Sequence, residues 1–279
     1  MRKVGHAALL ALLALPAFAC GDAGRSQAPL PQPVVLRIVF PEGFTREQMA
    51  ERVEAVGKIA LAKRGVRPLL TRQGYLKATA HLRPPSGFAQ ARGSEGFLFP
   101  ATYAFFSDES AERFVRRQLA AFRRAWAKVD LSYARSRNLT PYDVLIIASL
   151  VEREVVVPRE RRLVAAVIYN RLRARMPLGI DASLRYGLHI PPTRAITKAD
   201  LASDSPYNTR RWLGLPPTPI ANPGLASMLA AARPAPVPYL YFVRKPDCRS
   251  HFFTASASSF LSYTREGLRC SQGRPRSSG

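Results

Sequence analysis

The chain has 279 residues, enough for one large domain or two small ones around a substantial core. Its hydrophobic fraction of 47% is typical of a globular protein, but 42 basic residues against 19 acidic ones give a formal net charge of +23. A surface this basic attracts polyanions such as nucleic acid, anionic membrane or an acidic cell-wall polymer, unless the charge only reflects a coding preference for arginine.

The first 19 residues have the features of a secretory signal peptide. Arg2 and Lys3 precede an apolar run from Ala7 to Leu15, and small residues follow before Cys20. The run is too short to cross a bilayer, which needs roughly 20 apolar residues. We therefore predict export to the periplasmic face of a bacterial envelope, which excludes nucleic acid as a partner.

The three cysteines fit an exported protein. Ala17 and Ala19 form an A-x-A site for the ordinary signal peptidase, and alternatively Cys20 is the lipid-bearing first residue of a membrane-attached lipoprotein. Cys248 and Cys270 then remain, either as a disulfide formed in an oxidising periplasm or as two free thiols. No spacing of Cys and His in the sequence is typical of a metal site.

A small α/β unit follows the signal peptide. Residues 20–33 are rich in Gly, Pro and polar side chains, which is typical of a flexible tether. Residues 34–40 alternate as a strand does, and Thr45 is placed to cap a helix with Met49 and Val53 near one face. We expect these elements to form a subdomain over 34–90.

Residues 91–268 are expected to form a second, larger domain. The aromatic stretch 94–105 has a Pro in its middle and predicts a packed loop with short extended pieces. Residues 109–129 predict an amphipathic helix with Phe114, Leu119 and Phe122 on its apolar face. The next helix begins with Thr140 as its cap and Pro141 in its first position. That helix is almost entirely apolar, which predicts a central, buried position.

The rest of the chain alternates helices with loops rich in Pro and Gly. Residues 161–176 predict a helix, 177–192 an irregular segment or short hairpin, and 205–224 a long loop. A short helix, a β-hairpin over 239–245 and 250–256, a last helix and a disordered tail at 269–279 follow. The predicted fold class is therefore α+β, a small α/β subdomain followed by a mixed helical and β-hairpin domain.

Glu152 stands at the C-terminal end of the buried apolar helix. Burial against apolar surface and the negative end of the helix dipole both raise the pKa of a carboxyl group. An acid that stays protonated near neutral pH can donate a proton to a leaving oxygen, as cleavage of a glycosidic bond requires. The alternative is a structural glutamate paired with a nearby arginine such as Arg153 or Arg171.

Several segments resemble the YceG-like family of endolytic murein transglycosylases. They are, in order, PEGFT, EGFLFPATY, LTPYDVLIIASLVERE, YNRLRARMPLGID, RYG, SPYNT, GLPPTPIANPG and YLYFV, which span residues 41 to 243. The resemblance implies lytic cleavage of the glycan strands of peptidoglycan and a LysM-like unit before the catalytic domain. It also implies that strands of this polymer are the binding partner, while a cell-wall synthase as a second partner stays open.

The family's catalytic acid falls on Glu152. The resemblance implies that the substrate-binding residues, whose side chains either contact sugar or hold loops in place, are Glu95, Asn170, Arg171, Asp181, Tyr186, Tyr207, Asn208 and Asn222. The family mechanism needs no metal or cofactor. Protonated Glu152 cleaves the bond between N-acetylmuramic acid and N-acetylglucosamine, and the muramic C6 hydroxyl then closes on C1 to leave a 1,6-anhydro end.

The chain also departs from the family pattern. The family usually has a membrane-spanning helix where this chain has a signal peptide, and its TDPT segment reads IDAS here, with Ile180 and Ala182. Two other functions remain open beside the lyase. They are a non-catalytic peptidoglycan-binding protein and a muramidase that uses water.

Overall fold

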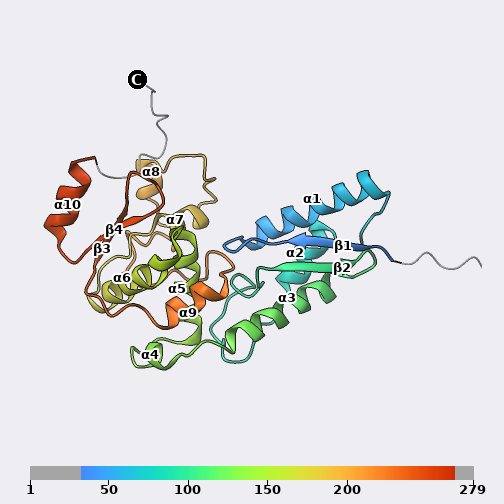
Figure 1. The fold of residues 1–279 in the computed structure, drawn as a ribbon, viewed down its shortest axis with the longest axis horizontal. Coiled ribbons are helices and arrows are strands. Elements are labelled where there is room, and N and C mark those ends of the chain that lie inside the picture. Colours follow the sequence, from blue (N-terminus) through green and yellow to red (C-terminus); the bar gives the residue numbers. More distant parts are fainter. Residues whose placement is uncertain (1–32, 268–279) are drawn as a thin grey trace, which may run out of the picture. The chain divides into compact units, whose positions relative to one another are not determined.

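The N-terminal part of the fold is a two-stranded antiparallel sheet covered by helices on one face (Figure 1). The computed structural model describes residues 33–267, in which strand β1 (Val35–Val39) pairs with β2 (Thr102–Phe106). Alternate side chains of the strands, such as Leu36 and Phe105, are buried with residues of three helices, while those between them face outward. The covering helices are α1 (Arg46–Arg64), α2 (Arg72–Ala80) and α3 (Ala111–Trp126).

The predicted first strand and first helix are confirmed. Thr45 caps α1, with its side chain accepting from the N–H of Gln48 while the Gln48 side chain accepts from the N–H of Thr45. Helix α2 was not predicted; Thr71 caps it by accepting from the N–H of Gly74. Its two buried side chains, Tyr75 and Thr79, give only a weak apolar pattern.

The packing of this part continues beyond the predicted division between residues 90 and 91. The partner of β1 is β2, and the core that they share includes Leu98 and Phe114. A long-range strand pairing of this kind has no local signal in the sequence. The likeness of this part to a LysM unit stays a prediction.

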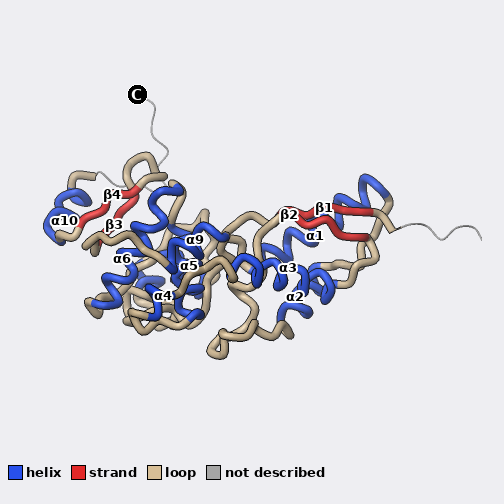
Figure 2. The backbone as a smooth tube through the Cα atoms, turned by 60° about the horizontal axis from the view of Figure 1, so that its bottom comes forward, coloured by secondary structure: helices blue, strands red, loops and turns tan. Residues whose placement is uncertain are grey.

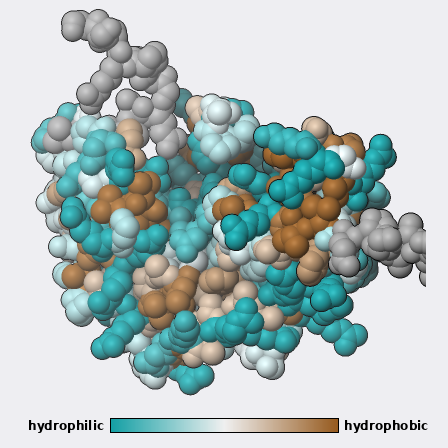
Figure 3. Space-filling model, turned by 45° about the vertical axis from the view of Figure 1, so that its right-hand side comes forward, coloured by the Kyte–Doolittle hydropathy of each residue, from teal (hydrophilic) through white to brown (hydrophobic). Residues whose placement is uncertain are grey.

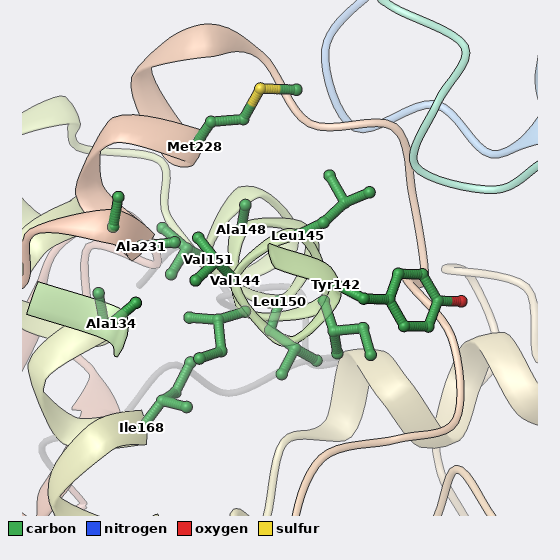
Figure 4. Packing of buried hydrophobic residues seen from close by; sticks show 14 of the residues in the cluster. Ala134, Tyr142, Val144, Leu145, Ala148, Leu150, Val151, Ile168, Met228 and Ala231 are labelled. Atoms are coloured by element: carbon green, nitrogen blue, oxygen red, sulfur yellow. The ribbon is translucent and has the colours of Figure 1, made fainter. Parts of the chain in front are cut away.

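The second core surrounds helix α5 (Pro141–Glu154), as Figure 4 shows along the helix axis. Its side chains from Val144 to Val151 are all buried. They pack against α6 (Arg161–Arg173) and α9 (Leu225–Ala232), and α4 (Ser132–Arg135), which contacts α9, adds Ala134 to the same core. The predicted cap is confirmed, since the Thr140 hydroxyl accepts from the N–H of Asp143. The position of α5 fixes where Glu152 lies.

The C-terminal half contains one correction to the predicted elements. The segment expected to be irregular or a hairpin holds helix α7 (Asp181–Gly187), which begins directly after Ile180 and packs against α5. The predicted hairpin is confirmed as β3 (Tyr241–Arg244) paired with β4 (His251–Thr254). The remaining elements are the 3-10 helix η1 (Pro158–Glu160), α8 (Lys198–Leu201) and α10 (Ala257–Arg265).

Two separate strand pairs among many helices make the fold α+β, as predicted (Figure 2). On the face shown in Figure 3, hydrophilic side chains surround scattered hydrophobic patches. Between residues 33 and 267, no helix is both long enough and apolar enough to cross a bilayer. The predicted signal peptide, most of the tether with Cys20, and the predicted tail with Cys270 lie outside the described residues.

Candidate active site

Glu152 lies near the end of α5 with only 6% of its side chain exposed. Its Oε2 accepts a hydrogen bond of 2.9 Å from the backbone N–H of Gly224, the residue that caps α9. The first N–H groups of a helix have no partner within that helix, so a carboxylate is a suitable acceptor for one of them. The start of α9 therefore fixes the orientation of the Glu152 carboxyl.

The arginine beside Glu152 is not one of the two that the sequence suggested. Nη2 of Arg161 lies 3.9 Å from Oε1 of Glu152, and Nε of Arg161 donates to the Ser227 hydroxyl at 3.2 Å. Arg153 instead donates to the Gly43 carbonyl, and Arg171 to the Leu240 carbonyl. Arg161 begins α6, directly after η1, and this chain reversal brings it back to the end of α5.

A second carboxyl group, that of Glu42, lies at the same place. A Cβ atom at Gly224 would overlap the Glu42 carboxyl, so the two groups are in close contact. Burial raises the pKa of Glu42, the negative charge of Glu152 raises it further, and Arg161 opposes both effects. Glu42 belongs to the PEGFT segment that carries the resemblance, but it was not among the predicted site residues.

The turn that carries Glu42 is held against the loop that carries Gly224. The N–H of Gly43 donates to the Asn222 carbonyl at 3.0 Å, and the N–H of Asn222 donates to the Phe44 carbonyl at 2.9 Å. Gly43 has a φ of 79°, and a Cβ there would lie 3.4 Å from Cγ of Glu152. A glycine thus permits this turn to approach the acid closely.

Asn222 is 0% exposed, and its side chain forms hydrogen bonds with two other segments, the loop of Glu95 and the turn of Phe44. Its Oδ1 accepts from the N–H groups of Gly96 and Leu98, both at 2.9 Å. Its Nδ2 donates to Glu95 at 2.6 Å and to the Phe44 carbonyl at 3.0 Å. Every hydrogen-bonding position of this amide is used within the protein, so Asn222 holds the loops around the acid.

Glu95, Tyr186 and Tyr207 come together at a cavity of about 200 Å³, which Arg46, Arg92 and Thr218 also line. The Glu95 carboxyl accepts from the Tyr186 hydroxyl at 3.2 Å and from the N–H of Arg46. Burial raises the pKa of Glu95 to about 7, although these hydrogen bonds oppose the effect. Glu152 does not line this cavity.

The other four predicted residues lie elsewhere and bond to the protein itself. Asn170 donates to the Val237 and Tyr239 carbonyls, and Arg171 donates to those of Pro177 and Leu178 as well as Leu240. Asp181 forms an exposed ion pair with Arg210 at 2.6 Å. Asn208 is buried and donates to the Leu201 and Ser203 carbonyls. The predicted residues thus lie in several places, and of them only Glu152 contacts the start of α9.

Within the described part of the chain, no group of three or more His, Cys, Asp or Glu side chains is placed to bind a metal ion. Cys248 is disulfide-bonded. Because Cys270 lies outside the described residues, its pairing with Cys248 stays a prediction.

Comparisons with known proteins show the family of the chain. The model of the YceG-like family matches residues 23–266. The endolytic murein transglycosylase of Bacillus subtilis is 36% identical over 153 residues, which are 55% of this chain and 42% of that protein. The protein of the same name from Streptococcus pneumoniae strain R6 is 31% identical over 229 residues, 76% of this chain and 41% of that one. The chain thus spans about two fifths of the length of these relatives.

A solved structure shares the fold. The crystal structure of a YceG-like protein from Listeria monocytogenes superposes with a TM-score of 0.67 at 29% sequence identity. The match covers 81% of this chain and 75% of that chain. The α+β arrangement of both cores is therefore that of a YceG-like protein.

Proposed function

This chain belongs to the YceG-like family, and from that premise we propose that it is a peptidoglycan lytic transglycosylase with Glu152 as its catalytic acid. The observation that carries the proposal is the setting of Glu152. It is a nearly buried carboxyl group that one backbone N–H orients and one arginine faces. The names of the curated relatives, endolytic murein transglycosylase, support the substrate class.

The proposed reaction requires one group that gives a proton and then takes one back. Protonated Glu152 donates to the oxygen between N-acetylmuramic acid and N-acetylglucosamine, and the bond from that oxygen to the muramic C1 breaks. The muramic C6 hydroxyl oxygen then bonds to C1, and its proton passes to Glu152. The product carries a 1,6-anhydro end, no water is consumed, and Glu152 is protonated again.

The surrounding residues have distinct proposed tasks. The N–H of Gly224 keeps the Glu152 carboxyl in one orientation, because it holds Oε2 at 2.9 Å. Asn222 and Glu95 keep the turn of Glu42 and the loop of Gly224 together. We propose that Tyr186 and Tyr207, which meet edge to face with ring centres 5.2 Å apart, offer an aromatic surface to a sugar of the strand.

We further propose that the chain is exported and works in the cell envelope, with residues 1–19 as a signal peptide and Cys20 either acylated or simply the first mature residue. Residues 34–90 would be a LysM-like unit and 91–268 the catalytic part. A cell-wall synthase is the proposed protein partner. The disulfide between Cys248 and Cys270 belongs to the same proposal, since an oxidising compartment favours it.

The product of digestion distinguishes the three functions considered. Purified peptidoglycan is incubated with the protein, and the released muropeptides are examined by mass spectrometry. Anhydromuramic ends are the expected product. Reducing muramic ends would instead identify a muramidase, and binding of peptidoglycan without any release would identify a non-catalytic protein.

A further inference from the structure

A groove of about 520 Å³ is lined in part by Arg161, the arginine that faces Glu152. Arg161 and Arg162 of α6, Ala226 and Leu229 of α9, and Pro158 of η1 line it. Lys128, Asp130 and Arg233 complete its polar wall, together with Ala230 and Ala232. The groove therefore combines four basic side chains and one acidic one with a short apolar strip.

The charges of the groove are only partly neutralised within the protein. Asp130 accepts hydrogen bonds from the N–H and the hydroxyl of Ser132, and the positive charge of Arg233 also stabilises its carboxylate. Arg162 donates to the carbonyls of Arg233 and Pro234, which are neutral partners and leave the charge of Arg162 without a counter-ion among the residues that the structure describes. Within residues 33–267, Lys128 and Arg233 form no side-chain ion pair. An anion that enters the groove therefore meets a net positive surface.

Arg161 connects the groove to the reaction centre. Arg161 lines the groove, and its guanidinium lies 3.9 Å from Glu152. A group bound there is thus one side chain away from the bond to be cut. Pockets of this size hold a ligand of several linked groups, and the exposed Leu229 offers apolar contact for its methyl groups.

We propose that this groove, defined by Lys128, Arg161, Arg162 and Arg233, binds the carboxylates of the peptide attached to the glycan strand that Glu152 cleaves. The proposal rests on the proposed function and names the part of the substrate that positions the strand. Guanidinium groups bind carboxylates through paired hydrogen bonds, and the muramic sugar carries its peptide next to the scissile bond. Peptide-bearing strands are therefore the preferred substrate.

A binding measurement tests the groove without relying on cleavage. A synthetic stem peptide with free carboxylates is titrated into the wild type and into the double variant Lys128→Gln/Arg233→Gln, whose changed side chains are on the surface. We expect about a 10-fold weaker affinity in the variant, which is about 1.4 kcal/mol. The control Lys63→Gln/Arg67→Gln also removes one lysine and one arginine charge, at exposed positions in α1 and shortly after it. It is expected to bind the peptide with the affinity of the wild type.

Two further ligands identify the chemistry. The same peptide with its carboxylates amidated is expected not to bind, and inorganic phosphate is expected to compete only at concentrations far above that of the peptide. Phosphate binding as tight as peptide binding would overturn the proposal, because the groove would then be a site for free anions. Equal affinity of the groove variant and the wild type for the peptide would overturn it as well.

Cleavage kinetics connect the groove to the substrate. On peptide-bearing strands, KM of the groove variant is expected to rise about 10-fold. The variant should therefore no longer prefer peptide-bearing strands to strands stripped of peptide. A groove variant that keeps the wild-type preference would contradict the proposal. If the wild type cleaves neither strand but binds the peptide through the groove, the proposed function fails while the groove assignment stands.

Discussion

The backbone N–H of Gly224 donates a 2.9 Å hydrogen bond to Glu152, and it joins the start of α9 to the end of α5. Glu42 rests against the same glycine from a third segment of the chain. The two carboxyl groups thus meet at a residue that has no side chain to separate them. This contact is the reason why a glycine is needed at position 224.

Replacing Gly224 by alanine is expected to displace Glu42 while leaving the fold intact. The new Cβ would overlap the Glu42 carboxyl, which is the far end of a flexible side chain and can move. Because the groups around Glu152 would shift with it, we expect cleavage of peptidoglycan to fall by about 10²-fold. The free energy of unfolding should change by less than about 1 kcal/mol. Calorimetry can measure this difference.

Gly57→Ala is the matched control for this change. Gly57 lies within α1, and a Cβ there would meet nothing within 4 Å. Alanine is favoured over glycine inside a helix by about 1 kcal/mol, so this variant should be slightly more stable and fully active. Equal activity of the two alanine variants would contradict the role given to Gly224.

The raised pKa of Glu95 predicts that the stability of the fold depends on pH. Burial raises its pKa to about 7 in the folded protein, above the value of 4.5 for a free glutamate. A raised acid pKa means that the folded state binds this proton more tightly. The stability that the proton provides is therefore complete below about pH 4.5 and is lost as the pH rises through about 7. The loss amounts to about 3 kcal/mol at most.

Glu95→Gln isolates this dependence, because glutamine stays neutral at every pH and has nearly the shape of the protonated acid. Its amide group can donate to the Tyr186 hydroxyl, which then acts as an acceptor. Urea unfolding of both proteins at pH 5 and pH 8 gives the comparison. The wild type should lose more stability than the variant between these pH values, and an equal loss would show that Glu95 does not titrate in this range.

Asn222 is expected to matter for stability because its amide joins its own loop to two other segments, the loop of Glu95 and the turn of Phe44. Asn222→Ala removes the amide that bonds to the buried N–H groups of Gly96 and Leu98 and to the buried carboxyl of Glu95. Each buried group left without a hydrogen bond costs about 1–3 kcal/mol, so a loss of several kcal/mol is expected. Asn170→Ala, at a half-buried amide with two carbonyl partners, should cost less.

What the sequence could predict here depended on local signals. The cap at Thr140 and the apolar run behind it predicted α5, its burial and the place of Glu152 at its end. Thr45 likewise predicted the start of α1. These signals lie within a few residues of the elements that they define, so one sequence is enough to recognise them.

The neighbours of Glu152 come from distant segments and had no such signal. Arg161 reaches the acid because η1 reverses the chain, and Glu42 reaches it because loop hydrogen bonds join its turn to Asn222. Sequence spacing pointed instead to Arg153, which is adjacent in the chain but directed at Gly43. Helix α7 was not predicted because the Pro and Gly residues before it favour a loop. Its conformation is instead decided by packing against α5.

Glu152→Gln tests whether Glu152 is the proton donor. The amide keeps the size of the side chain but cannot donate a proton as an acid, so we expect release of anhydro-muropeptides to fall by 10²-fold or more. Glu154→Gln changes a carboxyl two positions away that faces Arg244 at 3.9 Å, and it should retain most of the activity. Digestion of peptidoglycan, followed by mass spectrometry, should find anhydro ends with the wild type and Glu154→Gln but almost none with correctly folded Glu152→Gln. Wild-type release by Glu152→Gln would show that Glu152 is not the proton donor.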